Sequence, residues 1–152
     1  MSDWIETAPA ANTGDGEEER LYDELCAWTL GLLDAAFAHQ HAVDAWAVQR
    51  ADERTKPIAV GFGLVGLYLH LERGLTGREV QRMHMLLARR RQEWPRFVLP
   101  RERGAMTASD VMAARPGPER LRALDAWCAA VWAACAASRP AVVELLARHG
   151  IG

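Results

Sequence analysis

Five residues in this sequence combine ligand-capable chemistry with positions on apolar helix faces. They are Cys26, His41, Asp44, His70 and His84. His41 and Asp44 are three residues apart, so they lie on the same side of a helix. Their neighbours on that side, Phe37 and Val48, are apolar. A polar pair among apolar residues predicts side chains that point into the protein, where they need partners.

The same five residues are expected at similar depths in a bundle of helices. The turns near residues 35 and 75 should close the same end of the bundle. At about 1.5 Å per helical residue, His70 lies about 7 Å and His41 about 9 Å from that end. Cys26, Asp44 and His84 lie about 13 Å from it. Facing helices are about 8–10 Å apart, so we expect these side chains to meet.

Imidazole, thiolate and carboxylate groups are the usual ligands of divalent transition metals. We therefore predict a metal site with His41, His70 and His84 as preferred ligands and Asp44 and Cys26 as further ligands. Zinc is the first choice, and manganese, iron, nickel or copper are alternatives. Asp44 could instead accept a hydrogen bond from an imidazole or act as the catalytic base. A bound ion would act as a Lewis acid or activate water, as in a small metalloenzyme.

Two other interpretations of the same residues stay open, because no tight motif such as HExxH is present. The residues could form a buried polar network without a ligand, or a metal-free His/Asp active site. A different class of function is a non-catalytic adaptor that contacts a protein or acidic partner. It would use the Arg-rich region 78–103, which holds eight arginines and three glutamates. That balance does not indicate a dedicated nucleic-acid-binding protein.

The pattern of apolar residues and helix signals predicts an all-α fold. Expected helices cover residues 19–34, 36–52, 57–73, 77–93, 109–114, 119–137 and 140–148. Thr76 and Glu79 form a capping-box sequence, Pro57 suits a first helical turn, and Gly74 suits a helix end. Short connections between the first four helices predict an up-down bundle of four core helices, with the C-terminal helices packed across it or extending it.

The ends and cysteines of the chain indicate its organisation. Residues 1–19 carry six acids and no base, which predicts a flexible acidic tail over residues 1–18 and a single domain over residues 19–152. An odd number of cysteines, three, argues against a disulfide framework. Neither a signal peptide nor a membrane span is expected, so we expect a cytoplasmic protein. The oligomeric state and the identity of a small-molecule or protein partner are not indicated.

Several stretches resemble an uncharacterised family of small bacterial helical proteins that is known only as a domain of unknown function. The matching stretches are Leu25–Thr29, His39–Ala45, Leu67–Glu72, Thr76–Met85 and Trp94–Pro95. The resemblance covers about residues 20–150 and implies no activity. Three histidines in a helical bundle are also similar, in architecture alone, to the DinB-type metal-binding bundles. The pair of histidines four residues apart that characterises those bundles is absent from this sequence.

Overall fold

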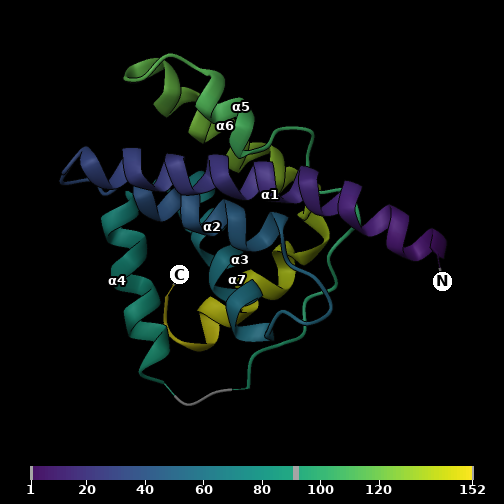
Figure 1. Ribbon diagram of the computed structural model, residues 1–152. Coiled ribbons are helices and arrows are strands. Elements are labelled where there is room, and N and C mark those ends of the chain that lie inside the picture. Colours follow the sequence, from purple (N-terminus) through teal and green to yellow (C-terminus); the bar gives the residue numbers. More distant parts are fainter. Residues whose placement is uncertain (1, 91–92, 152) are drawn as a thin grey trace.

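A computed structural model describes residues 2–90 and 93–151 of the chain, with side chains from residue 14 onward. The described part is helical and contains no strand, which confirms the all-α prediction. The helices are α1 (Ser2–Gly31), α2 (His39–Gln49), α3 (Pro57–Arg73), α4 (Gly77–Ala88), α5 (Ala108–Ala113), α6 (Pro118–Ala134) and α7 (Arg139–Arg148), with a short 3-10 helix, η1 (Ala136–Ser138), before α7 (Figure 1).

The helix ends follow the signals in the sequence. The Thr76 hydroxyl accepts a hydrogen bond from the Glu79 amide, and the Glu79 carboxylate accepts one from the Thr76 amide. Gly74 ends α3 in the left-handed conformation, with φ of 70°. The expected end of α4 at residue 93 is wrong, because α4 ends at Ala88. Leu87 is its last buried residue, and Arg89 and Arg90 after it are exposed.

Helices α2, α3 and α6 form the centre of the core, to which the other helices also contribute buried residues. Each of these helices contacts the other two, and Trp127 of α6 is fully buried among them. The Trp127 indole N–H donates to the Gln49 side chain at the end of α2, 2.9 Å away. Thus α6 is part of the core rather than an addition to a four-helix bundle. The up-down arrangement of the first four helices stays a prediction.

Helix α1 begins at Ser2 and includes most of the segment predicted as a flexible tail. It contacts α2 and α5 and crosses the molecule as a long rod (Figure 1). Two acids of this segment reach the rest of the chain. Asp15 pairs with Arg50 at 3.1 Å, and Glu18 accepts a hydrogen bond from the Ser109 amide at 2.9 Å. The division into a tail and a domain over residues 19–152 stays a prediction.

The three cysteines are free thiols, as the sequence predicts. None of the described helices is both long and apolar enough to cross a membrane alone. One pair, α6 with the segment Ala136–Arg148, meets the length and composition requirement together but is bent by 68°.

Candidate functional site

The structure places the five predicted site residues in three separate groups. His41 stacks on His70, Asp44 faces His84, and Cys26 hydrogen-bonds to Tyr22. Among the residues that the structure describes, no group of three or more His, Cys, Asp or Glu side chains is arranged to hold a metal ion. The predicted residues therefore meet in pairs and not as one cluster.

The first pair joins α2 to α3. The rings of His41 and His70 are nearly parallel, with centroids 3.5 Å apart and 17° between their planes. His70 is held at both of its nitrogens. Its Nδ1 lies 3.1 Å from the Leu75 carbonyl oxygen, and its Nε2 lies 3.0 Å from a carboxylate oxygen of Asp125. The left-handed turn at Gly74 brings Leu75 back toward α3, where its amide donates to the Leu69 carbonyl.

These contacts assign different protonation states to the two rings. Both partners of His70 are hydrogen-bond acceptors, and only the doubly protonated ring can donate to both. Burial first, and then the nearby charge of His70, lower the pKa of His41 to about 4. The contacts of His70 therefore suit its doubly protonated form, whereas the low pKa of His41 keeps that ring neutral near pH 7.

The stacked pair lines a pocket of about 340 Å³, a size typical of small-molecule sites. The pocket is lined by Asp34, Ala36, Ala38, His41, His70, Gly74, Leu75, Thr76, Leu121, Leu124 and Asp125. Asp34 shapes its edge, because the Asp34 carboxylate accepts a hydrogen bond from the Ala38 amide just before α2. Within the described part of the chain, we find no hydrogen bond to the ring nitrogens of His41. That ring can therefore bond to a molecule in the pocket.

The second pair joins α2 to α4 and is almost completely buried. One carboxylate oxygen of Asp44, Oδ1, accepts a hydrogen bond from the Gln40 amide at 3.1 Å and lies 4.0 Å from Nε2 of His84. The other oxygen, Oδ2, and Nε2 of His84 are buried without any hydrogen-bond partner among the described residues. Burial raises the pKa of Asp44 well above its usual value and lowers the pKa of His84 to about 4.

A glycine makes room for the Asp44 carboxylate. A Cβ atom at Gly66 of α3 would lie 1.9 Å from Oδ2 of Asp44, far inside van der Waals contact. The absence of a side chain at Gly66 therefore allows the carboxylate to lie directly against the α3 backbone.

Cys26 lies on α1 beside an aromatic pair. Tyr22 and Trp46 stack with ring centroids 4.2 Å apart, and the Tyr22 side chain hydrogen-bonds to Cys26. Burial raises the pKa of the Cys26 thiol, so the thiolate needed for nucleophilic attack or metal binding is disfavoured.

Two residues that complete these pairs were missed from the sequence. Asp125 lies on α6, and nothing in the sequence alone places α6 beside His70. Gln40 could have been found, because it precedes Asp44 by four residues and a Gln–Asp pair at that spacing interacts on a helix.

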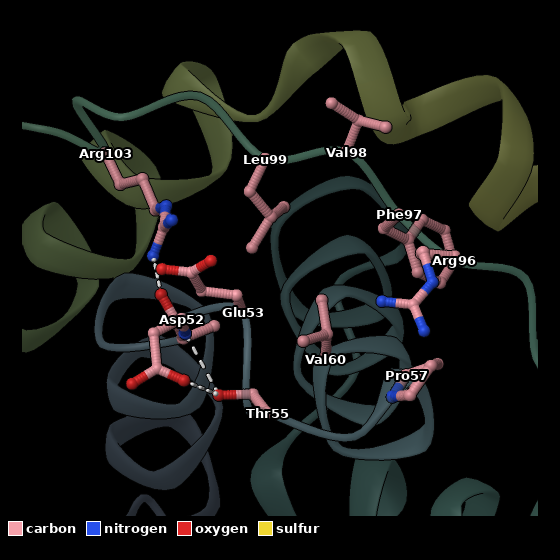
Figure 2. Close-up of a pocket in the computed structure, with 11 residues that line it drawn as sticks. Asp52, Glu53, Thr55, Pro57, Val60, Arg96, Phe97, Val98, Leu99 and Arg103 are labelled. Carbon is pink, nitrogen blue, oxygen red and sulfur yellow. Dashed lines mark hydrogen bonds between the residues drawn. The ribbon is translucent and has the colours of Figure 1, made fainter.

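A second pocket, of about 240 Å³, lies where residues 96–103 pass over the connection between α2 and α3. Figure 2 shows Arg103, Asp52 and Glu53 on one side of it and Arg96, Phe97 and Pro57 on the other. Asp52, one of its polar residues, makes hydrogen bonds within its own turn. Asp52 accepts hydrogen bonds from the Arg54 amide and the Thr55 hydroxyl, and the Arg54 amide lowers its pKa. No histidine lines this pocket.

Part of the Arg-rich region 78–103 bonds to the chain itself. The Arg103 guanidinium donates to the carbonyls of Val48, Gln49 and Ala51 at the end of α2. Arg90 donates to the His149 carbonyl at 2.7 Å. These two arginines therefore stabilise the fold and do not form a uniform basic surface.

No curated protein and no solved structure matches the chain. A family model, described as a family of unknown function, matches residues 10–136, which is more than half of the sequence. This agrees with the resemblance to an uncharacterised family that the sequence stretches carry. The chain belongs to this family of unknown function, DUF5946.

Proposed function

We propose that this protein binds a small organic molecule in the pocket lined by His41 and His70 and exchanges a proton with it. The observation that carries the proposal is the His41–His70 stack, in which Asp125 orients one ring. Two histidines in contact, with environments that favour opposite protonation states, are a common arrangement for acid–base chemistry.

The roles of the three residues follow from their contacts. His41 is neutral, so its ring offers one hydrogen-bond donor and one acceptor to a bound molecule. Both partners of His70 are acceptors that suit its doubly protonated form, and in that form the ring would stabilise negative charge that develops on the molecule. Asp125 and the Leu75 carbonyl fix the orientation of the His70 ring.

The pocket walls indicate the kind of molecule. Besides the histidines, the wall includes Leu75, Leu121 and Leu124. We expect a ligand with a mainly apolar body and one polar group, such as a hydroxyl, carbonyl or carboxylate, placed against His41. Pockets of this composition bind through apolar contact and use their few polar groups for orientation.

A screen of small alcohols, ketones and carboxylic acids by NMR would test the proposal. Compounds that bind should shift the imidazole signals of His41 and His70. Their affinity should fall at least about tenfold, about 1.4 kcal/mol, in His41→Gln, and should be unchanged in His39→Gln. His39 is a suitable control because it lies on the same helix, contacts the Thr29 hydroxyl and does not line the pocket. Binding that does not depend on His41 would contradict the proposal.

Metal binding in this pocket, as the sequence predicts, would need a rearrangement. The lone pairs of an imidazole lie in the plane of its ring, and the two planes here are nearly parallel. One ring would have to turn before both nitrogens could reach one ion. The adaptor function through residues 78–103 has less support, because Arg90 and Arg103 are bonded to the chain itself.

A further inference from the structure

We propose that Asp44 and His84 bind a divalent transition metal ion, with the side-chain amide of Gln40 positioning the His84 ring. This site is separate from the pocket of His41 and His70 and does not rest on the proposed function. It is the part of the predicted ligand set that the structure brings together in the protein interior.

The first argument is that each side chain of this pair has a buried polar atom without a partner. Asp44 is 2% exposed, and its Oδ2 atom has no hydrogen-bond partner, nor has Nε2 of His84. Buried polar side chains nearly always have a partner, and a specific exception calls for an explanation such as a bound ion. One ion between these groups would satisfy both.

The second argument is the spacing of the groups. Oδ1 of Asp44 and Nε2 of His84 are 4.0 Å apart, which is too long for a direct hydrogen bond. An ion about 2.0–2.2 Å from each ligand spans about 4.2 Å when the two ligands lie on opposite sides of it. The observed separation therefore fits two ligands almost opposite each other, and a small closing movement would give tetrahedral spacing.

The third argument is the presence of a polar side chain that positions the imidazole. The Gln40 amide nitrogen is placed 3.1 Å from Oδ1 of Asp44 and 3.4 Å from Nδ1 of His84. The oxygen and nitrogen of a glutamine amide are assigned from their neighbours. A half-turn of the amide would let its oxygen accept a hydrogen bond from Nδ1–H of His84, which leaves Nε2 free to bind the ion. Imidazole and carboxylate suit zinc, iron, nickel or manganese.

The surroundings are shaped for the carboxylate. Gly66 leaves the space that Oδ2 of Asp44 occupies, and the Phe62 ring lies edge-on to the His84 ring, with centroids 5.0 Å apart. The His84 side chain is 14% exposed, so an ion can enter from the α4 side. A bound ion would connect α2 to α4 and hold α2, the helix that carries His41, in place.

The test uses the full chain, stripped of metal with a chelator and checked for helicity by circular dichroism. Zinc binding is measured by calorimetry, and cobalt(II) binding by its visible absorption. We expect the wild type to take up one ion per chain. Asp44→Asn and His84→Gln should each weaken binding by more than the roughly 10- to 100-fold that loss of a supporting contact costs. His39→Gln, the matched control, should bind as the wild type does.

Three results would overturn the proposal. The first is a wild-type chain that binds neither ion. The second is binding that Asp44→Asn and His84→Gln leave intact while His70→Gln abolishes it, which would place the ion in the pocket. The third comes from a crystal grown with zinc, in which anomalous scattering locates the ion independently of any variant. An ion between Asp44 and His84 supports the proposal, and a water molecule there with zinc absent or elsewhere refutes it.

Discussion

The rings of His41 and His70 lie face to face with centroids 3.5 Å apart, although they come from different helices. Asp125 binds only one of them. Burial is the main cause of the low His41 pKa, and the charge of His70 adds to it, whereas the Asp125 carboxylate bonds to the His70 ring. The pocket beside them therefore holds a neutral and a protonatable imidazole next to each other.

Acidification should destabilise the fold between about pH 6.5 and pH 4. The folded pKa values of His41 and His84 are lowered to about 4, so the unfolded chain binds protons first as the pH falls. Each histidine can contribute at most about 1.4 kcal/mol per pH unit. Urea unfolding at a series of pH values measures this slope. His41→Gln should make it shallower, and an unchanged slope would contradict the assigned burial effect.

Loss of the Asp44 proton should destabilise the fold as the pH rises. The folded pKa of Asp44 is raised, so the folded chain holds a proton that the unfolded chain has lost, and stability falls as pH rises above about 3.8. In metal-free protein, Asp44→Asn should therefore raise the free energy of unfolding near pH 8 and have a smaller effect near pH 4. The same urea series checks this. A stability gain from Asp44→Asn that is smaller at pH 8 than at pH 4 would contradict it.

Gly66→Ala should destabilise the protein by about 1–3 kcal/mol, the usual cost of overpacking a core. The new Cβ would lie 1.9 Å from Oδ2 of Asp44. Shortening the clashing side chain in the double variant Gly66→Ala, Asp44→Ala should recover part of the loss in thermal unfolding. Gly16→Ala is the control, because no atom lies within 4 Å of its added Cβ. It should be neutral or slightly stabilising, since alanine favours a helix. Equal losses at both glycines would contradict the steric explanation.

Arg103→Lys should also cost stability, by about 1–3 kcal/mol, because hydrogen bonds from charged groups are strong and a lysine cannot reproduce the guanidinium fork. Arg103 donates to three carbonyls at the end of α2. Arg101→Lys, at an exposed position nearby, should be neutral. Chemical unfolding of the two variants provides the comparison. If both substitutions were neutral, the hydrogen bonds of Arg103 would not stabilise the end of α2.

Local features of this fold could be predicted from the sequence, whereas some partners of the site residues could not. The Thr76 capping box and the Gly74 helix end depend on short-range signals, and both are present. Counting residues from the turns near residues 35 and 75 predicts that His41 and His70 lie at similar distances from that end of the bundle. Their rings are in contact in the structure. Such counting uses only the rise per residue, which tertiary packing does not change.

The direction of each side chain around its helix was harder to predict. His41 and Asp44 differ by about 60° around α2, since three residues make 300°. In a packed core that angle decides the neighbour, so His41 meets His70 while Asp44 lies against Gly66 and faces His84. The contribution of Asp125 depends on where α6 packs, which the sequence pattern of α6 does not specify.

The most direct test of the acid–base pair is an NMR measurement of imidazole protonation on nitrogen-labelled protein at about pH 5.5, below the ordinary titration range of histidine. We predict two protonated ring nitrogens for His70 and one for His41. Titration should also show opposite shifts of the His41 pKa. It should rise in His70→Gln, which removes a nearby positive charge, and fall in Asp125→Asn, which removes a favourable negative charge. Two protonated ring nitrogens on His41 at this pH, or a His41 pKa that neither variant changes, would contradict the account.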